Sequence, residues 1–334
     1  MTVLLCLVFV ALPRFDRHDT DFMETSLVGR GADGSVSLGD APEYCNMVRF
    51  FRGEMGQQAM TTPFAYRPAV PFLASVLPIK DPMTALNVIN LASLALAMLL
   101  LHGAMRASGY GFWSAVVGDL IFAISFPVFY YGTIGLVDPV AVTVIAGALY
   151  GLYRQRWGFV CGCVLVGAFV KETTVIVLPV AFMHLVVTRP PKGWLKLLAV
   201  VVAYVVPTIL VRAVLDDLPS YEWRPSLGYL QQNLRVRALA AMGLSFGLPG
   251  LGFMLWLAGR RFRGVAMNPA VWAPMMMGVV CGIGLTAFAF VAAYADGRFL
   301  WLSSVFSIPF CLDVLGYFSK DRTIERDSVE IATR

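Results

Sequence analysis

Two adjacent residues of opposite charge, Lys171 and Glu172, interrupt an apolar run that extends from Gly158 to Val187. An ionisable side chain at bilayer depth costs roughly 2.5–3.5 kcal/mol on insertion scales, and it usually faces protein or a wet cavity. A buried ammonium group can hold a phosphate, and a carboxylate can accept a proton or bind hydroxyl groups. Because neighbours on a helix point about 100° apart, we expect the two side chains to have separate partners. The pair therefore marks a candidate functional site.

Acids and cations also gather around a predicted interfacial helix. Asp40, Pro42 and Glu43 form a helix-start signal, and the apolar residues that recur after them predict an amphipathic helix at the membrane interface. Transfer of a group from a phosphate to a hydroxyl needs a base for the acceptor proton and cations for the leaving phosphate. We expect Asp40 to be this base. The candidates for substrate binding are Glu43, Tyr44, Tyr66, Arg67, Asp138, Lys171, Glu172 and Arg298.

Plainer roles compete with these assignments. Asp40 and Asp138 could serve only to start helices, and Arg67 and Arg298 could be interface anchors. The opposite charges of the apolar run could form ion pairs that serve stability alone. The acids of the segment DRHDTD, at 16–21, are rivals to Asp40 as the base.

The composition identifies the setting as a membrane. Of the 334 residues, 58% are hydrophobic and 14% are charged, and the mean hydropathy is +0.71. Such a chain has too little polar surface to cover a soluble globule, so we predict an all-α, multi-pass membrane protein. The net charge of +5 does not indicate a nucleic-acid partner, because the charges lie between apolar segments. The scattered cysteines and histidines predict neither a disulfide framework nor a metal site, although a divalent metal ion bound by the acids stays an alternative.

Apolar segments of about 20 residues predict about ten transmembrane helices. Basic loops flank the run 158–187 on both sides, and short cytoplasmic loops collect Lys and Arg. This run must therefore cross twice and turn near Lys171. The segment 2–12 is counted as a short span, with a cleaved signal peptide as the alternative. The expected spans are 2–12, 84–105, 112–131, 134–153, two short crossings within 158–187, 195–215, 238–258, 270–294 and 298–318.

These spans make residues 1–318 a single transmembrane domain whose long first outer loop, 14–83, carries interfacial helices. The polar tail 319–334 and the N-terminus are expected on the cytoplasmic side of the plasma (inner) membrane. All of the candidate charges then fall at the outer end of the helix bundle. A lipid-linked substrate could enter there from the side, with its chain left in the bilayer.

Four stretches of the chain resemble the GT-C class of membrane glycosyltransferases. They are the region of Asp40 with the pattern x-P-x-Y-x-x-M and PFAYRPAVPFLA, then GLVDPVAV at 135–142, FVKETT at 169–174 and DGRFLWLSSVFSIPF at 296–310. The resemblance implies a polyprenyl phosphate-linked sugar donor and an acid of the first outer loop as catalytic base. It leaves the acceptor open as a glycan, a lipid or a protein. The competing hypotheses are a transporter or flippase for a lipid-linked or small anionic substrate, and a non-catalytic subunit of a membrane assembly.

Overall fold

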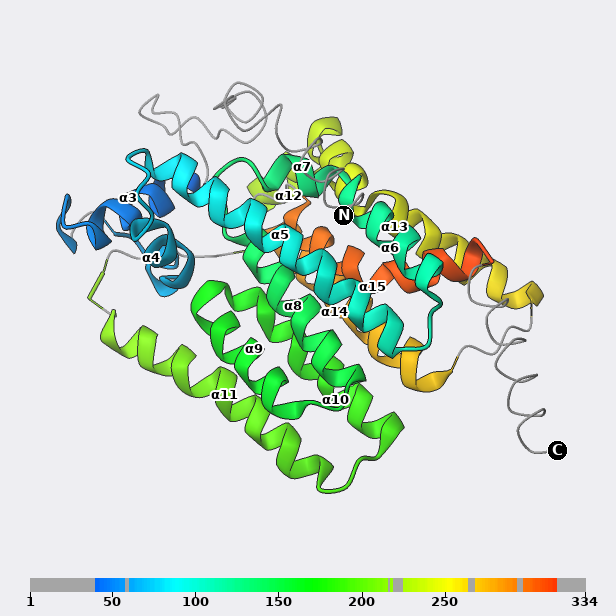
Figure 1. Cartoon of the computed structure of the whole chain (residues 1–334). Coiled ribbons are helices and arrows are strands. Elements are labelled where there is room, and N and C mark those ends of the chain that lie inside the picture. Colours follow the sequence, from blue (N-terminus) through cyan, green and yellow to red (C-terminus); the bar gives the residue numbers. More distant parts are fainter. Residues whose placement is uncertain are drawn as a thin grey trace.

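The structure, a computed structural model, is all-helical and has no strand within the residues that it describes (Figure 1). This finding confirms the all-α part of the predicted fold class. The predicted span 2–12, the rival acids at 16–21 and the tail 319–334 lie outside the described residues. The described ranges are 40–57, 60–215, 217–218, 225–263, 268–292 and 297–316.

Helices of several lengths make up the fold. In chain order they are α3 (Ala41–Phe51), η2 (Phe64–Tyr66), α4 (Ala69–Ser75), α5 (Pro82–Ala107), α6 (Phe112–Ala123), α7 (Phe126–Tyr131), α8 (Asp138–Tyr153), α9 (Trp157–Val170), η3 (Glu172–Ile176), α10 (Val177–Thr188), α11 (Gly193–Val214), α12 (Leu227–Asn233), α13 (Val236–Arg263), α14 (Pro269–Ala292) and α15 (Arg298–Val314). Four of them, α5, α11, α13 and α14, contain stretches long and apolar enough to cross a membrane, which indicates a membrane protein. The other crossings stay a prediction.

Two predicted spans are broken in the structure. The span expected at 112–131 is two helices, because α6 ends at Ala123 and α7 begins at Phe126 with Pro127 in its first turn. Proline suits the first turn of a helix, and it lacks the amide hydrogen that would bond to the preceding turn of a continuous helix. The backbone of α13 also leaves helical geometry, at Gly247 (φ 51°, ψ −151°). Neither segment is therefore one straight helix.

The apolar run 158–187 turns back on itself. α9 ends at Val170, Lys171 has an extended backbone, and η3 and α10 carry the chain back. The Nε2 atoms of Gln155, just before α9, and of His184, near the end of α10, lie 2.9 Å apart. Both ends of the run therefore lie at one end of the molecule, and the turn lies at Lys171, where the sequence predicts it.

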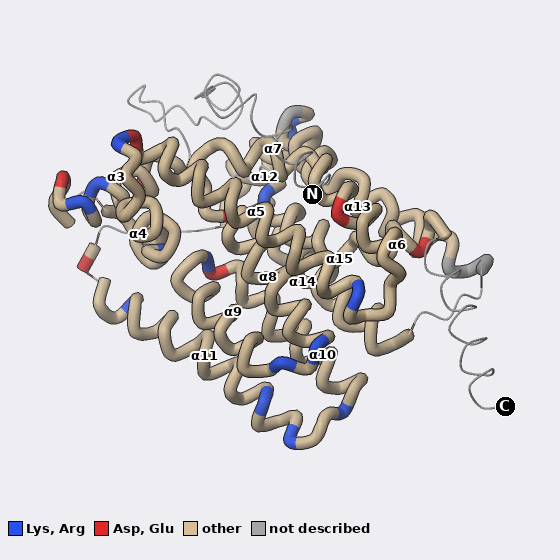
Figure 2. The backbone as a smooth tube through the Cα atoms, viewed as in Figure 1, with Lys and Arg blue, Asp and Glu red and all other residues tan. Residues whose placement is uncertain are grey.

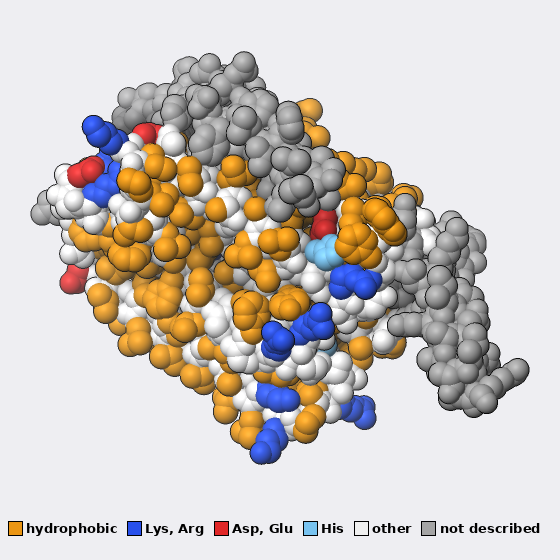
Figure 3. Space-filling model, viewed as in Figure 1, with side chains coloured by type: hydrophobic (Ala, Val, Ile, Leu, Met, Phe, Trp, Pro, Cys, Tyr) orange, Lys and Arg blue, Asp and Glu red, His pale blue; other side chains and the backbone are white. Residues whose placement is uncertain are grey.

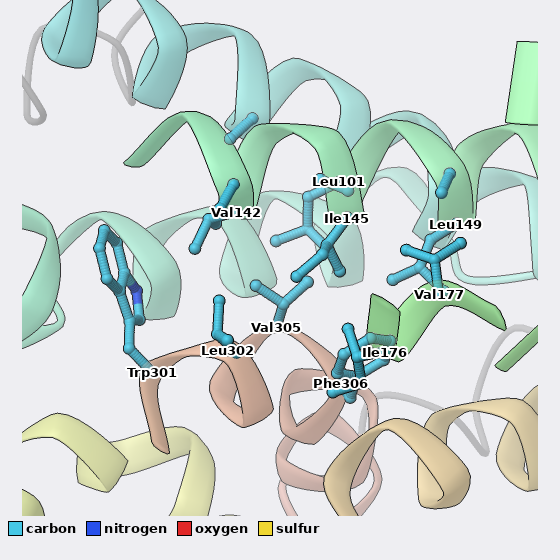
Figure 4. Close-up of a cluster of buried hydrophobic side chains, with 14 of the residues drawn as sticks. Leu101, Val142, Ile145, Leu149, Ile176, Val177, Trp301, Leu302, Val305 and Phe306 are labelled. Atoms are coloured by element: carbon cyan, nitrogen blue, oxygen red, sulfur yellow. The ribbon is translucent and has the colours of Figure 1, made fainter. Parts of the chain in front are cut away.

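α8 and α15 form the centre of the fold. α8 is buried along nearly its whole length, and α15 packs against both α13 and α14. Figure 4 shows Val142 and Ile145 of α8 facing Leu302 and Val305 of α15. Both helices begin with a charged residue, so this packing fixes where those two charges lie.

Glycines let α15 pack closely on its neighbours. A Cβ atom added to Gly252 of α13 would lie 2.5 Å from Cβ of Cys311, and one added to Gly278 of α14 would lie 2.3 Å from the ring of Phe306. Small residues allow this close approach, which is a common way to join helices in a membrane. The position of α15 therefore depends on both glycine contacts.

α11 runs along the edge of the molecule (Figure 1). It begins at Gly193, and its last turn at Val211 and Val214 lines a pocket together with Met47 of α3. At 1.5 Å per residue its 22 residues extend ~33 Å, which matches the ~30 Å hydrocarbon core of a bilayer. The start of α11 and the helix α3 are therefore separated by one membrane thickness.

Candidate functional site

Three ion pairs join charged residues that are far apart in the sequence. Each of the three cations also acts on Asp40 electrostatically, so the pairs form a single group, here called the charge cluster. All six residues are among the candidates that the sequence indicates. The pairs are Asp40 Oδ2 with Arg298 Nη1 at 2.6 Å, Asp138 Oδ1 with Lys171 Nζ at 2.6 Å, and Glu172 Oε2 with Arg67 Nε at 2.8 Å.

Helix ends bring the charge cluster together. Asp40 precedes α3, Asp138 is the first residue of α8, and Arg298 is the first residue of α15. Lys171 and Glu172 lie between α9 and α10, where the chain turns. The positive end of a helix dipole favours an acid at its N-terminus, which suits the two aspartates. The geometry of the cluster thus depends on the packing of the whole helix bundle.

Asp40 directs its carboxylate away from the helix that follows it. It stands at the N-cap position of α3, yet its side chain accepts no hydrogen bond there. It accepts one from Arg298 instead, and the exposed fractions of the two side chains are 20% and 14%. Burial alone would raise the pKa of Asp40, but Arg298, Arg67 and Lys171 together hold this pKa below its usual value. Asp40 is therefore ionised at neutral pH and able to accept a proton.

Asp138 and Lys171 form the deepest pair of the cluster. Their side chains are 1% and 5% exposed. The ammonium group of Lys171 also lies 5.5 Å from the ring centre of Phe299, within reach of a cation–π contact. The second carboxylate oxygen of Asp138 and the hydroxyl of Thr173 are both buried and have no hydrogen-bond partner among the described residues. Such atoms are rare in cores, and a bound ligand with polar groups would satisfy them.

Arg67 links Glu172 to α3. Its Nε donates to Glu172 at 2.8 Å, and its Nη1 donates to the hydroxyl of Tyr44, in α3, at 2.7 Å. Burial raises the pKa of the Tyr44 phenol, so this group stays neutral and can donate its own proton in turn. Arg67 and Tyr44 are both buried. Arg67 and Tyr44 therefore present fixed hydrogen-bond donors beside Asp40. A side chain that only anchored the protein at the membrane interface would not need these buried contacts.

Two further candidates, Glu43 and Tyr66, take no part in the three ion pairs. The carboxylate of Glu43 accepts a hydrogen bond from the hydroxyl of Thr61 at 2.7 Å. The ring of Tyr66 lies 5.5 Å from the guanidinium group of Arg212, near the end of α11. Their predicted roles in substrate binding stay predictions.

Sequence reasoning missed two residues that hold the cluster in place. The hydroxyl of Tyr204, in α11, donates to the backbone carbonyl of Glu172 at 2.7 Å and so fixes the turn. Phe299 lies under the ammonium group of Lys171. A signal existed for Tyr204, because it carries the one hydroxyl in the apolar stretch from Leu197 to Pro207. Phe299 gave no signal, since aromatic residues are common in apolar helices.

Among the residues that the structure describes, the charge cluster offers no group of metal ligands. Each acid of the charge cluster is paired with a cation. In the ranges that the structure describes, no three His, Cys, Asp or Glu side chains gather closely enough to hold a metal. The cluster is suited to chemistry by charged side chains.

An apolar pocket of about 380 Å³ opens beside α3. Met47 and Phe51 of α3 form one wall, and Leu210 and Val214 of α11 form another. Ala65 and Pro68 also line it, and these residues flank the Tyr66–Arg67 step of the chain. The pocket can therefore receive an apolar chain close to the cations of the cluster.

No protein-family model, curated protein sequence or solved structure matches this chain. Its function is therefore argued from the geometry of the charge cluster and its surroundings.

Proposed function

We propose that this chain is a membrane glycosyltransferase, which moves a sugar from a polyprenyl phosphate-linked donor to an acceptor on the outer face of the membrane. The observation that carries the proposal is the charge cluster, in which the ionised Asp40 lies against Arg298 and within the field of two more buried cations. Glycosyl transfer needs this combination of a base near the acceptor hydroxyl and positive charge near the leaving phosphate.

The side chains of the cluster divide the reaction between them. Asp40 takes the proton of the acceptor hydroxyl while the hydroxyl oxygen bonds to the anomeric carbon of the sugar. The bond from that carbon to the phosphate oxygen breaks, and its electron pair leaves with the phosphate. Arg298, Arg67 and Lys171 stabilise the negative charge that develops there. General-base help contributes typically ~10²–10⁴-fold, and fixed charge at the leaving group is often the larger effect.

Arg298 couples donor binding to the strength of the base. In the free protein its guanidinium group lies 2.6 Å from Asp40 and helps to lower the pKa of that carboxyl. A donor phosphate competes for the same guanidinium group, because arginine forms strong charge-assisted hydrogen bonds with phosphate. When Arg298 turns to the phosphate, the pKa of Asp40 rises and the carboxylate becomes a stronger base. Asp40 is thus activated where and when the donor is bound.

The apolar pocket supplies a place for the lipid end of the donor. It lies between α3 and α11. Ala65 and Pro68, on either side of Arg67 in the sequence, line the pocket, and Arg67 itself belongs to the charge cluster. A polyprenyl chain that enters from the bilayer can fill apolar space there while its phosphate meets the cations. Burial of apolar surface contributes roughly 25 cal/mol per Å², so the chain would add affinity without further polar contacts.

The test is transfer by the purified protein in liposomes with a panel of polyprenyl phosphate-linked sugars and membrane extract as the source of acceptors. Asp40→Asn keeps the shape of the side chain but removes the proton acceptor. We expect transfer to fall by at least ~100-fold while donor binding survives. Asp21→Asn is the control, because it changes a rival acid. If Asp21→Asn abolishes transfer and Asp40→Asn does not, the base is assigned wrongly.

A transporter for a lipid-linked or small anionic substrate is the second candidate, because helix breaks at Lys171 and Gly247 resemble the broken helices that form substrate sites in transporters. The two candidates differ in what the liposomes would show. A transporter moves labelled donor across the bilayer without release of polyprenyl phosphate, and a transferase releases it. Transport without release would favour the second candidate.

A further inference from the structure

Five cations lie on two neighbouring turns, at the other end of α9 from the charge cluster. No acid interrupts these turns, which the structure describes in full. Figure 2 shows basic segments without acidic ones around the end of α10 and the start of α11, and Figure 3 shows the basic side chains there beside apolar surface. The five, here called the basic platform, are Arg154 and Arg156 between α8 and α9, and Arg189, Lys192 and Lys196 around the turn between α10 and α11.

Contacts lock the two turns of the basic platform together. Gln155 of the first turn lies 2.9 Å from the ring of His184, which is buried at the end of α10. The ammonium group of Lys196 lies 5.9 Å from the ring centre of Trp157. The indole nitrogen of Trp157 donates to Gln155 at 3.4 Å. The cations are therefore carried on a rigid surface and not on independent loops.

The backbone of both turns is held in an unusual conformation. Gln155, Arg189 and Lys192 have φ values of 56°, 46° and 54°. Within the part of the chain that the structure describes, they are the only residues other than glycine with a positive φ. Left-handed backbone is unfavourable for such residues, and it persists where the surroundings determine it, often at ligand sites. Two of the five cations, Arg189 and Lys192, have this backbone conformation, and both are exposed.

Apolar side chains lie directly beside the cations. Trp194 and Leu195, at the start of α11, have exposed fractions of 65% and 64%, and α11 is long and apolar enough to cross a membrane. Tryptophan favours the level of lipid headgroups, and basic side chains near helix ends extend toward the same level. A small soluble anion would contact only the cations, whereas a phospholipid can contact the cations with its phosphate and the apolar side chains with its acyl chains.

We propose that the basic platform binds the headgroups of anionic phospholipids in the leaflet at its level. Juxtamembrane Lys and Arg residues are attracted to anionic lipid surfaces, and basic pockets between membrane helices bind such headgroups. The rigid pairing of the two turns makes this a site with a fixed arrangement of charge, which a mobile basic tail would lack. The proposal does not depend on the proposed transfer reaction.

The test compares two variants with the same loss of charge. The platform variant carries Arg154→Gln, Arg156→Gln and Lys192→Gln. The control variant carries Arg49→Gln, Lys80→Gln and Arg235→Gln, which remove two arginines and one lysine that are exposed elsewhere. Each full-length protein is purified in detergent and titrated with phosphatidylglycerol or phosphatidylcholine, and native mass spectrometry counts the bound lipid.

We expect the wild type and the control variant to prefer phosphatidylglycerol, and the platform variant to lose at least about tenfold in that preference, since each cation near an anionic surface contributes about fivefold. Equal losses in both variants, or no loss in the platform variant, would overturn the proposal.

A salt series on the wild type gives a result even if the triple variant does not fold. Raising the salt from about 0.1 M to about 1 M shortens the Debye length from ~10 Å to ~3 Å, and a preference that survives unchanged would also overturn it.

Discussion

At the scale of single residues, Lys171 has two separable roles, as a ligand for phosphate and as the counterion of Asp138. Both side chains are almost fully buried. Lys171→Met leaves the carboxylate of Asp138 buried without its partner, so we expect a loss of about 3–5 kcal/mol in the free energy of unfolding. Adding Asp138→Asn removes the unpaired charge and should restore much of that stability. Thermal unfolding and donor affinity are measured on each purified variant.

The two roles give different results in the double variant. If Lys171 binds the donor phosphate, donor affinity stays low although stability returns. If stability and donor affinity return together, the pair serves the fold alone and Lys171 is not a phosphate ligand.

The pH dependence of transfer reports on Asp40. Arg298 exerts the strongest charge effect that lowers the pKa of this carboxyl, so Arg298→Gln raises that pKa. A base acts only when it is ionised, and the acid limb of the kcat/KM profile follows its pKa in the free enzyme. We therefore expect this limb to move to higher pH in Arg298→Gln. Arg49→Gln, which changes an exposed cation of α3, should leave it in place, and an unmoved limb in Arg298→Gln would exclude Asp40 as the base.

The same pKa has a consequence for stability. A carboxyl group whose pKa is lowered in the folded state contributes stability that is present above its unfolded pKa, about 3.9 for Asp. That stability is lost as the pH falls through the lower, folded value. Asp40 should therefore add to the stability of the wild type at neutral pH and cease to do so in strong acid.

The sequence predicts the members of the charge cluster better than their pairing. Counting basic loops places Asp40, Arg67 and Lys171 at one end of the bundle, where the structure has them. The prediction that Lys171 and Glu172 have separate partners is confirmed. Which partner each one takes depends on helix rotation and depth, because one residue changes the direction of a side chain by about 100°. Neither the rotation of a helix nor its depth can be read from the sequence alone.

At the scale of helices, the contact of α13 with α15 can be tested at a single glycine. Gly252→Ala would place its Cβ 2.5 Å from Cβ and 2.7 Å from Cα of Cys311, and the Cα cannot move without shifting the helix. We expect this overpacking to cost about 1–3 kcal/mol. Gly243→Ala, in the same helix, meets nothing within 4 Å and should instead stabilise the helix by about 0.5–1 kcal/mol. Thermal unfolding in detergent compares the two, and equal melting temperatures would contradict the packing described here.

Hydropathy locates the helices, but not the places where they break. The helix predicted after Asp40 is confirmed as α3, with Tyr44, Met47 and Val48 buried on one face, whereas its place at the membrane interface stays a prediction. That face packs on protein, mainly α4 and α5. The break between Ala123 and Phe126 was not predicted, because the mean hydropathy of this segment stays high although the segment contains a proline. Local backbone chemistry decides such breaks.

At the scale of the whole molecule, α11 separates α3 from the basic platform by ~33 Å. Introduced cysteines can test whether these two levels lie on opposite sides of the membrane. In a background free of other cysteines, Glu54→Cys, just after α3, should react with an impermeant thiol reagent from outside. Lys192→Cys should react only after the membrane is permeabilised. Both positions are exposed, and labelling of Lys192→Cys in intact cells would contradict the proposed orientation.

The edge position of α11 makes bilayer thickness a variable for this molecule. Among the four candidate spans α11 is the least buried within the protein, and its last turns at Leu210, Val211 and Val214 form a wall of the apolar pocket. A helix longer than the local hydrocarbon layer tilts, and a shorter one draws the bilayer in around it. In a thinner membrane α11 would tilt and carry that wall with it, so the width of the pocket would change with the acyl-chain length of the surrounding lipid. Donor affinity measured in nanodiscs of short-chain and long-chain phosphatidylcholine would then differ, although no residue of the charge cluster had been touched.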